Sequence, residues 1–288
     1  MRFLLFGGSG QVGHALGVCW PSGDELTVST RQDCDFADEV SVRALVRRVR
    51  PDVIVNAAAY TAVDKAESDR ERCFTINAAT PTVIAAEAAA LGAKLVHYST
   101  DYVFDGDHAT PYVEEDSTGP RNVYGASKLA GERGIAEAGG EFLILRTSWV
   151  YSNHGANFLK TMLRLSAERT ELRIVADQRG APTSAEAIAG ATLRILKLSG
   201  EGGWTSGLFH MTAAGATTWY GFAKAIFARA AGPKPSLVPI ATAEYPTPAA
   251  RPANSILSND KFARTFGFQL PDWEQQLDAV MGTQTIAG

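Results

Sequence analysis

Residues 2–13 read RFLLFGGSGQVG, a short apolar strand that leads directly into a glycine-rich turn. The run fits both Gly7-x-x-Gly10-x-x-Gly13 and Gly8-x-Gly10-x-x-Gly13. Such glycines permit a tight turn, let backbone amides approach a pyrophosphate, and let the following helix pack closely with its N-terminus toward the phosphates. A glycine pattern alone is weak evidence, because any turn from strand to helix can use glycine. Its place after the first strand predicts a dinucleotide-binding loop.

Further apolar strands of the same kind support this interpretation. They are predicted at 25–29, 52–56, 94–99 and 142–146, with helical patterns at 40–49 and 78–92 between them. Strands that are apolar on both faces suit a parallel sheet covered by helices. The sequence therefore predicts an α/β fold with a Rossmann-type, doubly wound parallel sheet.

The pattern changes after about residue 150, to helices, short strands and proline-rich loops near 233–252. We predict a dinucleotide-binding domain at 1–150 and a smaller α+β substrate-binding lobe at 151–288. The lobe should lie over the carboxyl ends of the strands, where ligands bind in open α/β folds. A segment near 184–200 is expected to return to the first domain.

Composition, net charge and cysteine content exclude several classes of protein. The 288 residues are 45% hydrophobic and 20% charged, which is ordinary for a globular enzyme or binding protein. A net charge of −4 without a basic run argues against a nucleic-acid partner. Cys19, Cys34 and Cys73 lack metal-ligand spacing and indicate free thiols in a reducing compartment. The first apolar run is too short for a signal peptide or a membrane span, so we expect a cytoplasmic protein without a membrane partner.

Residues 122–132, NVYGASKLAGE, place a phenol and an ammonium four positions apart at Tyr124 and Lys128. On a helix this spacing stacks both side chains on one face. A lysine beside a tyrosine is expected to lower the tyrosine pKa, and a tuned tyrosine can pass a proton to a carbonyl that receives a hydride. Tyr220 and Lys224 repeat the spacing, but they lie in an alanine-rich pattern where helix packing is the simpler interpretation.

Arg31 ends the second predicted strand, where a site for NAD more often carries an acid that holds the ribose hydroxyls. A guanidinium suits a 2′-phosphate, so we predict NADPH as the cofactor. Asp33 and Asp35 follow closely and leave NADH open, and a solvated arginine at the end of a strand is the structural alternative.

Motifs spread over nearly the whole chain carry a resemblance to a known family. They are DFAD at 35–38, NAAAYTAVDKAE at 56–67, YSTDYVF at 98–104, RTSWVY at 146–151, DQRGAPT at 177–183, TTWY at 217–220 and YPTPAARPANS at 245–255. With the glycine loop and NVYGASKLAGE, they make the sequence similar to the extended short-chain dehydrogenase/reductases and, among these, to the dTDP-4-dehydrorhamnose reductase family.

The resemblance implies an oxidoreductase that reduces the C4 ketone of dTDP-4-dehydro-β-L-rhamnose to dTDP-β-L-rhamnose, the last step of dTDP-rhamnose biosynthesis for cell-surface polysaccharides. It implies that Tyr124 is the acid, that Lys128 orients the nicotinamide ribose, and that Thr100 hydrogen-bonds the reacting oxygen. The implied cofactor-binding residues are Gly7, Gly10, Gln11, Val12, Gly13, Thr30, Arg31, Asp35, Phe36, Ala57, Ala58, Ala59, Tyr98, Tyr124 and Lys128. The implied substrate-binding residues are Thr100, Asp101, Trp149 and Arg251.

Several of these residues also have plain structural interpretations. Trp149 offers a flat apolar face to a sugar or a thymine, but it could be a core residue. Arg251 suits a diphosphate, but it could be an ordinary surface arginine. Asp101 could cap a turn. Asn77, within a helical pattern, could bond to backbone near the site.

One departure from the family concerns metal. Some members are dimers joined by a magnesium ion, with one carboxylate ligand on the first helix, where this sequence has His14-Ala15. Glu186 stands at what would be another ligand position, but a lone carboxylate is a poor magnesium site. We therefore expect no bound Mg²⁺ and no metal-bridged dimer, which leaves a homodimer of another kind open.

Two rival functions stay open at this point. An epimerase or dehydratase of the same superfamily would recycle a tightly held NAD, although a dehydratase would be expected to follow Thr100 with Asp and Glu, and here Tyr102 follows Asp101. A non-catalytic regulatory subunit on the same fold would bind a dinucleotide without turning over a ketone. Such a subunit would have no need of the complete set of Thr100, Tyr124 and Lys128.

Overall fold

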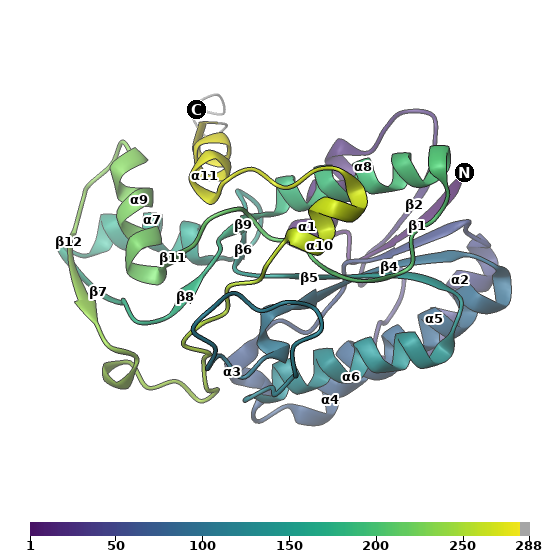
Figure 1. Ribbon diagram of the computed structural model, residues 1–288, viewed down its shortest axis with the longest axis horizontal. Helices are drawn as coiled ribbons and strands as arrows, with labels where there is room; N and C mark the ends of the chain where they lie inside the picture. The colour runs from purple at the N-terminus through teal and green to yellow at the C-terminus, as the bar shows by residue number, and fades with distance from the viewer. Residues whose placement is uncertain (283–288) are drawn as a thin grey trace.

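The computed structural model describes residues 1–282. At its centre is a six-stranded parallel sheet with helices on both faces (Figure 1). In spatial order the strands are β10 (Gly207–His210), β5 (Glu141–Thr147), β4 (Lys94–Thr100), β3 (Val53–Asn56), β1 (Arg2–Phe6) and β2 (Glu25–Ser29). The chain runs from β1 to β2 at one edge and then crosses to β3, so the winding direction reverses between β1 and β3. The predicted Rossmann-type α/β fold is confirmed.

Alternate residues of β1 face opposite sides of the sheet, and each side has its own apolar core. Phe3 and Leu5 pack against α1 and α8, whereas Leu4 and Phe6 pack against α2, α5 and α6. These helices are α1 (Gln11–Cys19), α8 (Ala185–Gly202), α2 (Glu39–Val49), α5 (Thr80–Leu91) and α6 (Val123–Ala138). The two layers seen in Figure 1 therefore follow from strands that are apolar on both faces.

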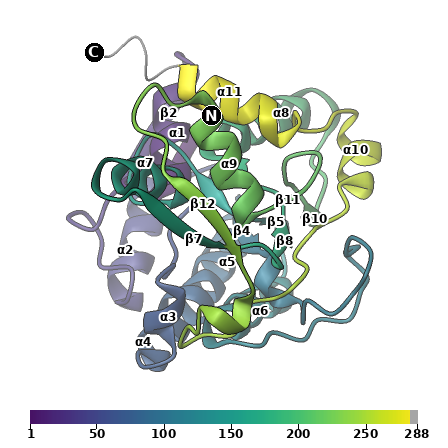
Figure 2. The same cartoon turned by 90° about the vertical axis from the view of Figure 1, so that its left-hand side faces the viewer.

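A third apolar cluster lies beyond the sheet, in the second half of the chain. Its main elements are α7 (Phe158–Glu168), β7 (Glu171–Val175), α9 (Trp219–Arg229), β12 (Ser236–Ile240) and α11 (Trp273–Gly282). β7 and β12 form a parallel ribbon that faces the viewer in Figure 2. Short strand pairs connect this part to the sheet, namely β6 (Val150–Tyr151) with β9 (Thr183–Ser184) and β8 (Arg179–Gly180) with β11 (Thr217–Thr218).

The predicted boundary at residue 150 stays a prediction, but the structure identifies which later segments lie against the sheet. α8 packs on α1 with Ile188 and Ala189 in the first core. β10 pairs with β5 as an edge strand, and Phe262 of α10 (Asp260–Phe266) joins the same core. The sequence indicated a short strand here but not its pairing with β5, because so short a run does not reveal its partner.

The helical run from Arg70 to Leu91 is long and apolar enough, by length and composition alone, to cross a membrane. It consists of α4 (Arg70–Phe74), a π-helical turn at Thr75–Ala79, and α5. In the structure this run packs against α2 and α6 and contributes Ile84 to the core. Its apolar character therefore serves the interior of the fold.

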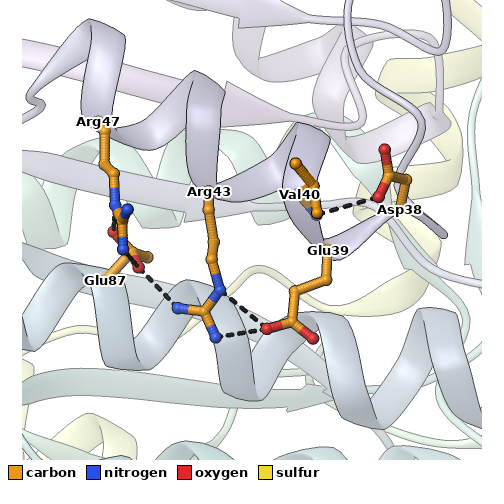
Figure 3. A network of polar contacts seen from close by, with 6 residues as sticks. All are labelled: Asp38, Glu39, Val40, Arg43, Arg47 and Glu87. Atoms are coloured by element: carbon orange, nitrogen blue, oxygen red, sulfur yellow. Dashed lines mark hydrogen bonds and ion pairs between the residues drawn. The ribbon is translucent and has the colours of Figure 1, made fainter.

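A polar network ties α2 to α5 (Figure 3). The Glu87 side chain of α5 is 6% exposed and accepts hydrogen bonds from Arg43 at 2.6 Å and from Arg47 at 2.7 Å. Arg43 also donates to Glu39 one turn earlier, at 2.5 Å. Hydrogen bonds from Arg47 first, and also from Arg43, hold the pKa of Glu87 below its ordinary value against the effect of burial.

Glu87→Gln should lower the free energy of unfolding at pH 7 by about 1–2 kcal/mol, since it removes the charge from a buried acceptor of two guanidinium groups. A carboxylate with a lowered pKa stabilises the fold above its ordinary pKa, and this contribution is lost as the pH falls. The difference between the two proteins in denaturant unfolding should therefore shrink toward acid pH. Glu39→Gln is the matched control, because that side chain is 58% exposed. An equal loss in both variants would contradict the assignment.

Candidate active site

A cavity of about 1000 Å³ extends along the carboxyl ends of β1 to β5. All the predicted cofactor-binding residues line it except Gly13, which lies behind the loop. Its lining includes Gly7, Gly10, Gln11, Val12, Thr30, Arg31, Asp35, Phe36, Ala57, Ala58, Ala59, Tyr98, Tyr124 and Lys128. The structure thus brings the glycine loop and the tyrosine–lysine pair to one cavity.

The glycine loop is shaped by close backbone approach. Gly7 has φ +82, and a Cβ on it would lie 2.6 Å from the Ala58 nitrogen. A Cβ on Gly13 would lie 2.1 Å from the Gly7 carbonyl oxygen. Because side chains cannot fit at these positions, the first turn of α1 sits directly against the end of β1. The N-terminus of α1 therefore faces the cavity, as a pyrophosphate site requires.

The two acids near Arg31 both have hydrogen-bond partners within their own loop. Asp33 accepts hydrogen bonds from the Thr30 amide at 2.8 Å and hydroxyl at 2.7 Å, which lower the Asp33 pKa. Asp35 caps the next turn by accepting from the Ala37 amide at 2.9 Å. Arg31 itself is exposed and lines the cavity. Both acids are thus engaged locally, while the guanidinium lies beside the cavity.

Tyr124 is placed by the start of α6. The Asn122 side chain caps the helix by accepting from the Gly125 amide at 2.8 Å, and the Glu67 carboxylate accepts from the Val123 amide at 2.8 Å. The Tyr124 ring lies edge-on to Tyr102, with centroids 5.8 Å apart. A capped helix start therefore holds the phenol at the wall of the cavity.

The expectation that Lys128 lowers the Tyr124 pKa is wrong for this state of the protein. The Tyr124 pKa is raised, first by burial, with Asp101 and Cys73 adding to the rise and a hydrogen bond with Thr100 opposing it. Removing the phenol from water disfavours its charged form more than any neighbour favours it. Tyr124 therefore keeps its proton, which suits a proton donor.

Lys128 is buried, with 2% of its surface exposed, and its nitrogen is already engaged. It donates to the Tyr98 carbonyl oxygen at 2.6 Å and lies 3.1 Å from His97 Nε2. Burial lowers the Lys128 pKa to about 8. The Tyr98 hydroxyl is 2.7 Å from Thr192 Oγ1 of α8, on the face of β4 opposite to Lys128. The contact of Tyr98 with Lys128 is therefore made by its backbone carbonyl.

Thr100 and Asp101 form a buried pair beyond the end of β4. The Thr100 hydroxyl donates to Asp101 Oδ1 at 2.8 Å and accepts from the Tyr102 amide at 3.2 Å. Burial raises the Asp101 pKa to about 6, with opposing effects from Ser255 and Thr100. Thr100 therefore caps the turn at 101–103, a role that the sequence analysis had considered for Asp101.

The four predicted substrate-binding residues all lie outside the lining of this cavity, namely Thr100, Asp101, Trp149 and Arg251. Trp149 has a left-handed backbone, with φ +47, and its ring stacks on Trp219 at 3.6 Å. Arg251 donates to Asp64 at 2.9 Å and to the Ala249 carbonyl oxygen at 3.2 Å. A left-handed conformation in a large non-glycine residue costs energy and is commonest at functional positions.

The sequence analysis missed a loop from the second half of the chain that covers the glycine loop. Asn157 donates to Gln11 Oε1 at 2.9 Å, and Ser152 donates to the same oxygen at 3.2 Å. Gly155 and Ala156 line the cavity. The polar run SNHGAN was the available signal, but nothing in it indicates which part of the fold it contacts.

Asn77, in the π-helical turn, is fully buried and its side chain bonds to two other segments. Its side chain accepts from the Tyr60 amide at 2.8 Å and donates to the Tyr60 carbonyl oxygen at 3.0 Å and to Ser127 Oγ at 3.0 Å. Ser127 in turn donates to the Tyr124 carbonyl oxygen at 2.7 Å. Asn77 thus bonds to backbone near the site and also ties α6 to the loop after β3.

The other predictions from the sequence concern the thiols, metal binding and the second tyrosine–lysine pair. All three cysteines are free thiols, as predicted. Within residues 1–282, no group of three His, Cys, Asp or Glu side chains could hold a metal ion, and His14 stacks on His154 instead. The residues present do not fit a magnesium site around Glu186. Tyr220 and Lys224 lie on α9, away from the cavity lining.

Comparison with known proteins adds independent evidence. Residues 1–286 match the family model described as the RmlD substrate binding domain. A dTDP-4-dehydrorhamnose reductase of Burkholderia thailandensis is 48% identical over 284 residues, and one of Escherichia coli K12 is 48% identical over 285 residues, with 95% of each protein covered in both cases. A crystal structure of a dTDP-4-dehydrorhamnose reductase from Bacillus anthracis in complex with NADP superposes with a TM-score of 0.91 at 37% identity, covering 97% of this chain and 98% of that chain.

Asp101→Asn should make the protein more stable at pH 7.5 but not at pH 4.5. A carboxyl group whose pKa is raised in the folded state destabilises the fold progressively as the pH rises through about 4 to 6. The amide can still accept from Thr100 and carries no charge, so denaturant unfolding should give a gain of about 1–3 kcal/mol that is present only at the higher pH. A gain of equal size at both pH values would show that Asp101 ionisation is not the cause.

Proposed function

The chain belongs to the dTDP-4-dehydrorhamnose reductase family, and from that premise we propose that it reduces the C4 ketone of dTDP-4-dehydro-β-L-rhamnose to dTDP-β-L-rhamnose with NADPH. The observation that carries the proposal is the single cavity lined by a dinucleotide-type glycine loop at one end and by Tyr124 and Lys128 at the other. A protonated phenol at that end meets the need of a ketone that receives a hydride.

Tyr124 is assigned as the proton donor because burial keeps its hydroxyl protonated. NADPH, when bound, supplies the hydride. As negative charge develops on the ketone oxygen, Tyr124 donates its proton, which its raised pKa keeps in place until that moment. The developing charge makes the hydrogen bond stronger in the transition state than in the ground state, and this difference accelerates the reaction.

Lys128 and Thr100 support this donor from different sides. An ammonium on Lys128, fixed by the Tyr98 carbonyl oxygen, provides positive charge beside the nicotinamide end of the cavity. Thr100 belongs to the hydrogen-bonding surroundings of Tyr124, and its own proton is directed to Asp101. We assign Thr100 to holding the phenol in place rather than to donating directly to substrate in this state.

We assign Arg251 and Trp149 to binding the sugar nucleotide, although neither lines the cavity itself. Arg251 is held in place by the Asp64 carboxylate, which is 43% exposed, while its own side chain is only 18% exposed. A diphosphate can replace or share this carboxylate, since both are oxygen anions that a guanidinium binds in a fork. Trp149 offers the ring for a planar base or an apolar sugar face.

The preference for NADPH rests on Arg31. Its neighbour Asp33 already accepts two hydrogen bonds from Thr30, which leaves this acid less available to the hydroxyls of an unphosphorylated ribose. A 2′-phosphate beside a free guanidinium gains charge-assisted hydrogen bonds that NADH lacks. The NADP in the Bacillus anthracis relative agrees with this assignment.

The rival functions fit the chain less well. The relatives at 48% identity are reductases by name, whereas a UDP-glucose 4-epimerase of Thermus thermophilus is 20% identical and shares the fold alone. A purely regulatory subunit would not need Tyr124 and Lys128 in one cavity. Stoichiometric oxidation of NADPH with the dTDP-linked 4-keto sugar, followed by identification of the product, separates these functions.

Tyr124→Phe should lower kcat by about a hundredfold or more, because the ring is kept while the donated proton is deleted. NADPH binding, measured by fluorescence titration, should stay within about threefold of wild type. Tyr220→Phe is the matched control, since it removes the same hydroxyl from the second tyrosine–lysine pair. A Tyr124 variant that keeps most of its turnover would remove this residue from the mechanism.

Arg31→Ala should raise KM for NADPH by about tenfold or more and leave KM for NADH within about threefold, because only the phosphorylated cofactor loses a charge-assisted contact. Steady-state kinetics with both cofactors measure this ratio. Arg50→Ala, at the far end of α2, is the control for loss of a positive charge. Equal weakening with both cofactors would place the basis of the preference elsewhere.

A further inference from the structure

A chain of buried polar groups runs from Lys128 away from the cavity. Asn56 ends β3, and His97 lies opposite it in register on β4. The Asn56 amide nitrogen is 3.0 Å from His97 Nδ1, and His97 Nε2 is 3.1 Å from Lys128 Nζ. The three side chains are 1%, 0% and 2% exposed. Groups buried to this degree must satisfy one another, so the donors and acceptors along the chain are coupled.

The direction of these hydrogen bonds is fixed from the end farthest from Lys128. The backbone N–H of Ala58 donates to Asn56 Oδ1 at 3.1 Å, which turns the amide NH₂ group of Asn56 toward His97. Nδ1 of His97 must therefore accept. A neutral imidazole that accepts at Nδ1 carries its proton on Nε2. Burial lowers the pKa of His97 well below its ordinary value, so the ring is neutral.

This tautomer presents an N–H, rather than a lone pair, to Lys128. An amine nitrogen has a lone pair that can accept that hydrogen, whereas an ammonium has donors only. An ammonium would fit if His97 moved its proton to Nδ1 and the Asn56 amide turned over. The Ala58 N–H would then face the NH₂ group of Asn56 and lose its acceptor, which is costly for a partly buried donor. The two proton states of Lys128 are thus coupled to a backbone N–H on the floor of the cavity.

We propose that Asn56 and His97 are positioning residues that favour the amine form of Lys128 in the free protein, and that a bound dinucleotide shifts Lys128 to the ammonium form by taking up a proton from solvent. This inference rests on the proposed function only in taking the cavity to bind NADP(H). The reaction at the lysine is simple: its lone pair gains one proton, and the negative charge of the cofactor stabilises the product.

The other groups around Lys128 favour its charged form and partly offset the effect of burial. Glu132, one turn later on α6, and Cys73 of α4 favour the charged form. Glu132 is itself paired with Arg146 of β5 at 2.7 Å, which limits its effect. Tyr124 on α6 is a neutral phenol. Burial outweighs these effects and lowers the Lys128 pKa to about 8, so the amine form predominates above that pH and a moderate change in its surroundings can alter its charge there.

The tautomer of His97 is the first test and needs only the wild-type protein. Nitrogen-15 spectra of histidine-labelled free protein, at a pH slightly above 8, distinguish a protonated ring nitrogen from an unprotonated one. His97→Gln identifies the signals by their loss. We expect a proton on Nε2 and a bare Nδ1. A proton on Nδ1 would overturn the proposal, because Nε2 would then offer Lys128 the lone pair that an ammonium needs.

Proton uptake on binding is the second test. Calorimetric titration with NADP⁺ at about pH 8.5, in two buffers of different ionisation enthalpy, should report uptake of roughly half a proton or more by wild type. Asn56→Asp should reduce this uptake by at least half. The new carboxylate accepts from His97 Nδ1–H and from the Ala58 N–H together, so Nε2 becomes an acceptor and Lys128 is already charged. Unchanged uptake in this variant would overturn the proposal.

A pH profile connects the same variant to catalysis. The alkaline limb of kcat/KM should move to higher pH by about one unit or more in Asn56→Asp, because the lysine holds its proton longer. His210→Asn is the control for changing a buried histidine, since His210 also has a strongly lowered pKa but does not line the cavity. If the protein binds NADP⁺ with proton uptake but does not reduce the sugar, the proposed function alone is wrong. If the protein reduces the sugar without proton uptake on binding, this inference alone is wrong.

Discussion

The site depends on how closely α6 approaches its neighbours. A Cβ on Gly125 would lie 2.1 Å from the Tyr102 carbonyl oxygen, and a Cβ on Gly131 would lie 2.1 Å from that of Asn77. The helix therefore contacts the turn after β4 and the π-helical turn directly through backbone. This contact buries Lys128 and holds Tyr124, which is partly exposed, at the wall of the cavity. A π-helical turn at such a contact accommodates the approach without breaking the helical run.

Burial at this contact drives the titratable groups toward their neutral forms. It raises the pKa of Tyr124, lowers that of Lys128 to about 8 and raises that of Asp101 to about 6. The common cause is that a charge loses its hydration there while the free protein supplies few opposite charges. A dinucleotide and a sugar diphosphate bring negative charge into the cavity. Under the proposal made above, its ligands rather than the protein determine the charge of the lysine.

Local pattern was enough to predict the sheet, the glycine loop and the position of Tyr124 and Lys128, because apolar strands and glycine spacing act over a few residues. Contacts between distant segments were beyond it. The stack of Trp149 on Trp219 joins residues 70 positions apart, and the Arg251–Asp64 pair spans 187 positions. The direction of the Tyr124 pKa shift was predicted wrongly for a related reason. Sequence spacing indicates the neighbouring lysine but says nothing about burial.

The groups assigned to bind ligands already have partners within the protein. Arg251 is bonded to Asp64, Trp149 is stacked on Trp219, and Lys128 is bonded to the Tyr98 carbonyl oxygen. Each of these contacts keeps a polar or aromatic group in place without leaving it unsatisfied, which lowers the ordering cost of binding. A ligand must therefore make a contact at each position that is at least as favourable as the internal contact it replaces. A diphosphate can match a carboxylate for Arg251, and a planar base can match an indole for Trp149, whereas a ligand lacking either would leave the internal contact in place. The proposed assignment of Arg251 and Trp149 therefore predicts that nucleotide sugars are discriminated by exchange against these internal partners as well as by the shape of the cavity.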